Sequence, residues 1–170
     1  MKDVRPTSGK VLQALFNILG SMEGRSFLDL FSGTGRVAME ALKRGACPVT
    51  AVELVPSRGR TVHSLLSPYR DAAVLTMDVR RAIDWLCRKG SSFDVVFADP
   101  PYGARWTSEI GALLFPPEKN GIIAPGGIAV VEHARRETIP PGAGYALIDR
   151  REYGDTVLTF LSAARGEEGS

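Results

Sequence analysis

Apolar positions along the chain follow two periods that alternate with each other. Over residues 8–19, the apolar side chains recur at helical spacing, which predicts an amphipathic helix. From residue 27 onward, short apolar runs typical of buried strands alternate with further helical patterns. The expected strands are 27–31, 49–53, 73–76, 93–98 and 128–132, and the expected helices are 36–44, 57–66, 79–89 and 108–115.

This alternation predicts an α/β fold of three layers, in which βαβ crossovers build a parallel, doubly wound sheet. The end of the chain departs from it, because residues 145–153 and 156–163 form two extended runs joined by Gly154-Asp155, a hairpin turn signal. We therefore expect a Rossmann-like, mostly parallel sheet that ends in an antiparallel hairpin. The pattern indicates a single domain over residues 1–164 and a flexible tail at 165–170.

Composition narrows the class of protein. A hydrophobic fraction of 44% and a charged fraction of 24% are ordinary for a soluble globular domain. The first residues have no apolar signal region, and no apolar run approaches the roughly 20 residues that span a bilayer. Cys47 and Cys87 lack metal-ligand spacing, so we expect buried thiols in a reducing cytoplasm, no bound metal and no membrane. The net charge of +2 leaves a nucleic-acid partner undecided.

Acidic residues follow the first three expected strands, where doubly wound sheets bind ligands. Asp29 lies at the end of the first strand, before a loop in which Gly33 and Gly35 allow a tight turn and close approach to a ligand. Glu53 ends the second strand and can accept from both ribose hydroxyls of a nucleoside cofactor. Asp78 follows the third strand and can accept from an adenine amine. The set suits S-adenosylmethionine.

Two other interpretations of this loop are open. The spacing Gly33-x-Gly35-x-x-Ala38 also fits a dinucleotide fingerprint, and hence an NAD-dependent enzyme. Asp29 argues against it, because its charge would lie near the pyrophosphate, whereas an aminoacyl ammonium is attracted by that charge. The loop could also be a glycine-rich turn with capping acids.

The fourth expected strand runs into Asp99-Pro100-Pro101-Tyr102. Each proline fixes its own φ and pushes the preceding residue into an extended conformation. The Asp99 carboxylate and the Pro100 carbonyl can then converge on the two hydrogens of an amino group, while Tyr102 stacks on a flat base. This arrangement is typical of methylation of an exocyclic amine in nucleic acid. A rigid turn capped by Asp99 is the structural alternative.

The typical rate contributions of the two effects favour alignment of the substrate amine over proton abstraction as the main role of this loop. General acid–base help contributes roughly 10²–10⁴-fold, which is about 3–5 kcal/mol. Correct positioning can contribute about 7–11 kcal/mol. We therefore expect Asp99 to act as a hydrogen-bond acceptor more than as a base.

The chain also resembles a known family over nearly its whole length. Arg5-Pro6-Thr7-Ser8, the run 14–19, the two loops above, Val130-Val131-Glu132-His133 and Tyr153-Gly154-Asp155-Thr156 are similar to the RsmD-type methyltransferases. The resemblance implies a seven-stranded methyltransferase fold and methylation of guanine N2 in 16S ribosomal RNA. It also implies that residues 1–20 lie over the site. The cofactor residues expected are Asp29, Phe31, Gly33, Thr34, Gly35, Glu53, Leu54, Asp78 and Val79, and the catalytic residues Asp99, Pro100, Pro101 and Tyr102.

The expected partner is ribosomal RNA or the small ribosomal subunit, bound by a monomer. Candidate RNA-binding residues are Arg5, Thr7, Arg105 and Arg135, and Arg105 is favoured because it lies just past the catalytic loop. Arginines of this kind also occur simply on solvated faces. His63 and His133 lack a partnering acid or cysteine cluster, so we expect structural roles for them.

Competing functions share parts of this pattern. An N6-adenine methyltransferase of nucleic acid would use the same glycine loop and Asp-Pro-Pro-Tyr. Such enzymes usually need a target-recognition segment, and only about sixty residues separate the two motifs here. A protein-amine methyltransferase more commonly has asparagine in place of Asp99. A non-catalytic nucleotide-binding Rossmann module would leave the Asp99 loop unexplained.

Overall fold

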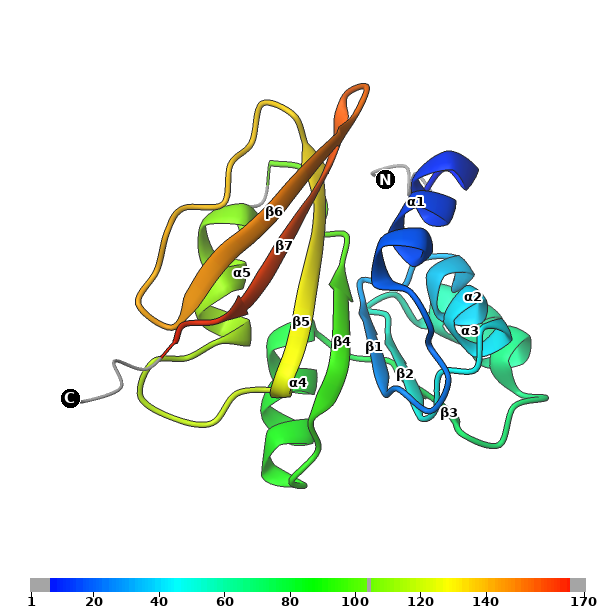
Figure 1. Ribbon diagram of the computed structural model, residues 1–170. Helices are drawn as coiled ribbons and strands as arrows, with labels where there is room; N and C mark the ends of the chain where they lie inside the picture. The colour runs from blue at the N-terminus through cyan, green and yellow to red at the C-terminus, as the bar shows by residue number, and fades with distance from the viewer. Residues whose placement is uncertain (1–6, 104, 166–170) are drawn as a thin grey trace. The chain divides into compact units, whose positions relative to one another are not determined.

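The computed structural model describes residues 7–103 and 105–165. The chain divides into two compact units, Met1–Ala82 and Ile83–Ser170. Each unit has its own sheet strands and helices (Figure 1), and each is treated separately below. The expectation of a single domain over residues 1–164 stays a prediction.

The first unit is built on three parallel strands in the order β3-β2-β1. They are β1 (Phe27–Leu30), β2 (Val49–Val52) and β3 (Ala72–Leu75), with Phe27 in register with Val49 and Val49 with Ala72. Every residue of β1 and β2 is buried, as expected for parallel strands that are covered on both faces. The helices are α1 (Gly9–Leu19), α2 (Arg36–Lys43), α3 (Pro56–Leu66) and the first turn of α4 (Val79–Arg88).

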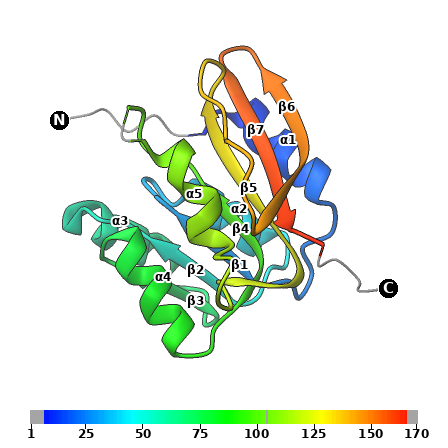
Figure 2. The same ribbon diagram turned by 90° about the vertical axis from the view of Figure 1, so that its left-hand side faces the viewer.

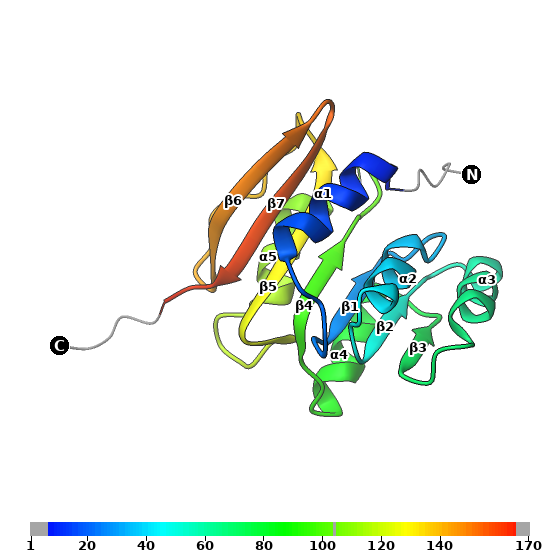
Figure 3. The same cartoon turned by 45° about the vertical axis from the view of Figure 1, so that its right-hand side comes forward.

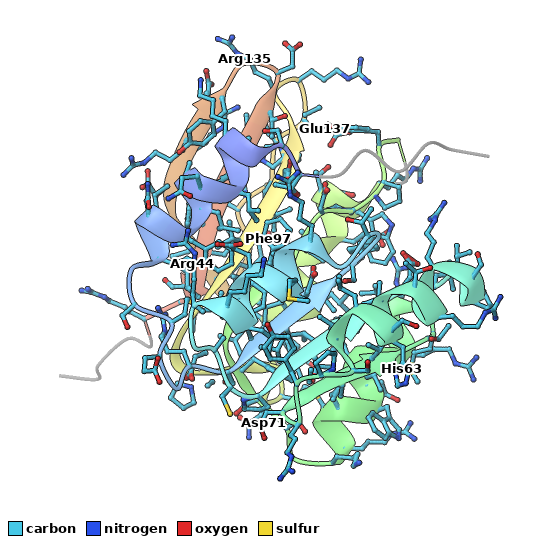
Figure 4. All side chains as sticks on the ribbon, turned by 90° about the vertical axis from the view of Figure 1, so that its right-hand side faces the viewer. Arg44, His63, Asp71, Phe97, Arg135 and Glu137 are labelled. Atoms are coloured by element: carbon cyan, nitrogen blue, oxygen red, sulfur yellow. The ribbon has the colours of Figure 1, made fainter. Side chains whose placement is uncertain are left out.

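Helix α1 is attached to the first unit through its apolar face. The hydroxyl of Ser8 accepts from the Val11 amide at 3.2 Å and caps the first turn. Phe16 stacks on Phe27 of β1 with ring centroids 6.0 Å apart. The Arg44 guanidinium, at the end of α2, lies 5.0 Å from the centre of the Phe16 ring. Figure 3 labels α1, α2 and β1, and Figure 4 labels Arg44. The N-terminal helix is therefore held between β1 and α2.

The second unit contains the strand order β4-β5-β7-β6. Strand β4 (Phe93–Ala98) pairs parallel with β5 (Ile123–Ala134), and β7 (Thr156–Ala163) pairs antiparallel with both β5 and β6 (Tyr145–Tyr153). Figure 2 shows β6 and β7 running beside β5, with α5 (Trp106–Leu114) packed against this part of the chain. The C-terminal hairpin is thus confirmed with the bounds that the sequence predicts.

The fifth strand is longer than the expected 128–132. Between the pairs Phe93↔Ile123 and Val95↔Ile128, β4 advances by two residues and β5 by five. The extra residues form an irregularity around Gly126, whose φ of 76° is left-handed. Two adjacent glycines look like a loop in the sequence, and here they let the strand continue past an irregular turn.

The prediction of buried thiols was wrong. Cys47 is exposed and Cys87 only half-buried. Cys47 lies in the turn that leads into β2, outside the buried strand, and a hydrogen bond with the Asp71 side chain raises the pKa of its thiol. Cys87 lies on α4, where partial burial raises its thiol pKa. Neither sulfur therefore belongs to the core.

Tyr145 packs tightly against two glycines in the second unit. A Cβ on Gly111 of α5, or on Gly142, would overlap the Tyr145 ring. The Tyr145 hydroxyl donates to the Pro140 carbonyl, so the ring also holds the long loop between β5 and β6. The two glycines are required for close approach of the tyrosine.

We predict that Gly111→Ala lowers the free energy of unfolding by about 1–3 kcal/mol, because the added methyl group overpacks against Tyr145. Urea denaturation followed by circular dichroism measures the change. Gly9→Ala is the matched control, since it also adds a methyl to a helical glycine, but at an ordinary contact distance of 3.4 Å from Arg36 Nη2. It should leave stability unchanged or raise it by up to about 1 kcal/mol. Equal stability of Gly111→Ala and the wild type would contradict the packing argument.

Candidate functional site

The turn from β1 into α2 is organised by a buried carboxylate. Asp29 is 1% exposed, and its Oδ2 accepts from the Ser32 hydroxyl at 3.0 Å and from the Ala38 amide at 3.2 Å. The first bond closes the loop back onto the end of the strand. The second satisfies an amide in the first turn of α2, where the helix leaves its amides without internal partners. Asp29 therefore fixes the position of the whole glycine loop.

The backbone of this loop is left-handed at several points. Gly33 and Gly35 have φ values of 59° and 79°, and Phe31, which has a side chain, has a φ of 59°. A Cβ on Gly35 would lie 3.1 Å from Leu65 and 3.2 Å from Val62 of α3, so glycine is required there for space as well as for φ. Strained non-glycine residues such as Phe31 cluster at binding sites.

Glu53 joins the glycine loop to the end of β2. It is 5% exposed; its Oε1 accepts from the Gly33 amide at 3.1 Å and its Oε2 from the Val55 amide at 2.9 Å. An ionised carboxylate has about four acceptor positions, so two bonds leave capacity for a diol. Leu54, which follows it, is 62% exposed and offers an apolar surface beside this carboxylate.

The third acidic residue caps a helix. Asp78 Oδ1 accepts from the amides of Arg80 at 2.9 Å and Arg81 at 3.4 Å, at the start of α4. Thr34 is exposed, whereas the Val79 side chain is buried in the core. The first unit thus places all the predicted cofactor residues at the carboxyl ends of three adjacent strands: 29–35 at the end of β1 and just past it, 53–54 after β2 and 78–79 after β3.

Arg36 was missed in the sequence analysis. Its Nη1 donates to the buried Thr7 carbonyl at 3.0 Å, and its Nη2 lies near Gly9, so it ties the segment before α1 to the glycine loop. The sequence did contain a sign of this role. A positive charge in the first turn of a helix is unfavourable beside the helix dipole, so an arginine there indicates that another contact holds it. Thr7 is thereby placed beside α2. The predicted residue Arg5 lies outside the described residues.

The Asp99 loop begins where β4 ends. Ala98 is the last residue of the strand, Asp99 is half-buried, Pro100 is buried, Pro101 is exposed and the Tyr102 ring is 45% exposed. The strand therefore delivers a carboxylate followed by an accessible aromatic ring.

The two predicted RNA-binding arginines of the second unit differ in their surroundings. Arg105 has a φ of 60° at the N-cap of α5, and its carbonyl accepts from the Ser108 hydroxyl at 2.7 Å. Arg135 follows β5 and forms an ion pair with Glu152 at 3.3 Å (Figure 4). Because Glu152 partly neutralises Arg135, Arg105 is the stronger candidate for a phosphate contact.

The two histidines differ in their surroundings. His133 is buried in β5, with Nδ1 2.9 Å from the Ala134 carbonyl and Nε2 2.7 Å from the Thr159 hydroxyl, and burial lowers its pKa. His63 lies exposed on α3 (Figure 4). Within 7–103 and 105–165, no group of three or more histidine, cysteine or acidic residues could hold a metal ion. In the same residues, no helix has the length and apolar character needed to cross a membrane.

Comparison with known proteins identifies the family. The family described as conserved hypothetical protein 95 matches residues 1–162. YlbH of Bacillus subtilis, a candidate rRNA methyltransferase, is 32% identical over 157 residues, which cover 89% of this chain and 84% of that protein. Ribosomal RNA small subunit methyltransferase D of Escherichia coli K12 is 29% identical over 138 residues, or 81% and 68% of the two chains.

Solved structures show the same fold. The candidate methyltransferase yhhF of Escherichia coli superposes with a TM-score of 0.79 at 27% identity, covering 94% of this chain and 87% of that one. An RNA methyltransferase of Salinibacter ruber in complex with S-adenosylhomocysteine gives a TM-score of 0.71 at 15% identity, covering 97% and 98%, a likeness of fold alone. The predicted fold class, α/β and mostly parallel with antiparallel strands at the C-terminal end, is confirmed. The chain belongs to the conserved hypothetical protein 95 family, which is the RsmD family that its sequence resembles.

Proposed function

We propose that this protein transfers a methyl group from S-adenosylmethionine to the exocyclic N2 amine of a guanine in 16S ribosomal RNA. The observation that carries this proposal is the Asp99-Pro100-Pro101-Tyr102 loop at the end of β4, in a chain of the RsmD family. The relatives named as small-subunit rRNA methyltransferases support the substrate class. The substrate is rRNA or the small ribosomal subunit, and the enzyme acts as a monomeric domain over residues 1–164 in the cytoplasm.

The residues at the carboxyl ends of β1, β2 and β3 fit S-adenosylmethionine chemically. When bound, this cofactor supplies an electrophilic methyl group on a sulfonium. Asp29 gives the loop negative charge near an aminoacyl ammonium, and Glu53 accepts from the ribose hydroxyls. Leu54 offers its exposed side chain to the adenine ring, and Asp78 accepts from the adenine amine. The remaining contacts come from Phe31, Gly33, Thr34, Gly35 and Val79.

The Asp99 loop orients the amine that is methylated. The lone pair of a guanine amine is delocalised into the ring, so the amine is a weak nucleophile. Hydrogen bonds from its two protons to the Asp99 carboxylate and the Pro100 carbonyl favour the pyramidal form, whose lone pair is available. Pro101 keeps the loop rigid, and Tyr102 stacks on the base. Arg5, Thr7, Arg105 and Arg135 hold the RNA backbone.

We predict that Asp99→Asn lowers kcat for methylation by about tenfold or more, because the neutral amide oxygen is a weaker acceptor for the substrate amine than the charged carboxylate. The affinity for S-adenosylmethionine should be unchanged. Transfer of a labelled methyl group to small subunits from cells lacking the gene measures kcat, and calorimetry measures the affinity. Asp84→Asn is the control, because Asp84 forms a surface ion pair with Arg88 and has no proposed role in catalysis. Unchanged kcat in Asp99→Asn would contradict the assignment.

Glu53→Gln should instead weaken cofactor binding, raising the Kd for S-adenosylmethionine by about tenfold or more, or about 1.4 kcal/mol. The amide nitrogen of glutamine would face the Gly33 or the Val55 N–H, each of which needs an acceptor. Isothermal titration calorimetry measures the Kd. Glu40→Gln, which removes only a surface pair with Arg44, should bind as the wild type does. A normal Kd in Glu53→Gln would show that the carboxylate is dispensable.

The identity of the base is tested in ribosomal RNA. Mass spectrometry of 16S rRNA from cells with and without the gene should show one guanine that loses a methyl group on N2. The purified enzyme should restore that methyl group to small subunits from the deletion strain. Loss of an N6-methyladenine instead would favour the alternative adenine specificity. The absence of any change in rRNA would overturn the assignment of this substrate.

A further inference from the structure

Glu132 is a second carboxylate at the carboxyl end of the strand beside the Asp99 loop. It is the tenth residue of β5, it is 7% exposed, and it is in register with Leu158 of β7. Neither the glycine loop nor the Asp99 loop contains it. A carboxylate is costly to bury unless donors surround it, and an ionised carboxylate has about four acceptor positions, so Glu132 can accept from more than one donor.

Asp99 and Glu132 each come one residue after the last pair in the register of β4 and β5. In the parallel pair β4–β5, Phe97 is in register with Val130 and Ala98 with Val131. Pro100 holds Asp99 in an extended conformation, so the alignment continues by one residue and pairs Asp99 with Glu132. Partners in a parallel pair present their side chains on the same face of the sheet, and neighbouring strands lie about 4.8 Å apart. Extending the register in this way puts the two carboxylates on the same face of neighbouring strands, at the end of the sheet.

A guanine offers donors that match this pair. Its Watson–Crick edge presents the N1–H and the two N2 protons next to each other, so one carboxylate can accept from N2 and its neighbour from N1. Adenine presents an unprotonated N1, whose lone pair would face the second carboxylate. Enzymes that act on a base read this edge by hydrogen bonds once the base has left the stack.

We propose that Glu132 is a specificity residue that accepts a hydrogen bond from guanine N1–H while Asp99 accepts from N2. This rests on the proposed methylation of guanine N2. Because Glu132 is shielded from bulk water, its hydrogen bond to N1 is strong, and a base that lacks the N1 proton leaves the carboxylate facing a lone pair. Sites built to bind such a polar group reject an analogue without it by as much as about 10⁴-fold.

The test compares guanine with 2-aminopurine, which keeps the 2-amino group but has no proton on N1. RNA is prepared with one or the other base at the position that the wild-type enzyme methylates, and kcat/KM is measured for each. The wild type should prefer guanine by about 10²-fold or more. Glu132→Gln should lose about 10²-fold on guanine and bring the preference close to one, because its amide N–H can donate to the free N1 of 2-aminopurine.

Two further variants separate specificity from folding. Glu132→Asp keeps the carboxylate and should keep the preference for guanine, at a reduced rate. Glu137→Gln, on the loop after β5 (Figure 4), changes a glutamate outside the strand and should match the wild type in rate and preference. S-adenosylmethionine affinity and circular dichroism verify that each variant is folded. If Glu132→Gln does not fold, the proposal is tested by Glu132→Asp, which should keep the preference for guanine.

The outcomes distinguish this proposal from the one on which it rests. An unchanged guanine preference in folded Glu132→Gln, or a preference lost in Glu132→Asp, overturns the role of Glu132 and leaves the proposed function intact. If the wild-type enzyme does not methylate guanine N2 at all, the proposed function fails before the comparison is made. A rate loss that is equal on both bases would also overturn the proposal, since it indicates a purely structural role.

Discussion

The Asp29 carboxylate is the contact on which the first unit depends. The loop has three left-handed residues between 31 and 35 and few backbone bonds of its own, such as the one from the Gly35 amide to the Ser32 carbonyl. The Oδ2 of Asp29 adds to these by accepting from the Ser32 hydroxyl and from the first turn of α2. Removing the carboxylate would cost more stability than the hydrogen bonds contribute on balance, because their donors would stay buried without an acceptor. The carboxylate that we propose to attract a cofactor ammonium is thus also the group that shapes the glycine loop.

The glycine loop and the segment after the Asp99 loop each contain a non-glycine residue with a strained, positive φ. Phe31 in the glycine loop and Arg105 after the Asp99 loop are the non-glycine residues with positive φ in the part of the chain that the structure describes. Each costs on the order of 1–3 kcal/mol and persists because its surroundings determine it. Phe31 directly follows the buried strand β1, whereas Arg105 is the N-cap residue of α5.

Periodicity predicted the elements well because hydrophobic spacing determines which face is buried. The runs 93–98, 145–153 and 156–163 are strands with the expected bounds. Local sequence patterns predicted less well the features that depend on residues far apart in the sequence. The glycines near 126 are typical of a turn, but β4 pairs with the residues on both sides of them, so the strand continues. The hydrogen bond from Arg36 to Thr7 joins residues 29 apart in sequence. The sequence pointed to Asp29 and Glu53 as candidates, but not to their bonds with Gly33, Val55 and Ala38.

The pairing of Asp99 with Glu132 limits which base the site can serve. Two ionised carboxylates about 5 Å apart, at an effective dielectric constant of about 20, repel each other by about 3 kcal/mol. Such a pair is stable only when donors lie between or around the two groups, or when one carboxylate takes up a proton. A guanine edge brings three polar protons on adjacent atoms and offsets this repulsion on binding, whereas an adenine edge brings two protons and an acceptor. The repulsion between the two carboxylates of the proposed pair thus favours guanine over adenine as the base that enters.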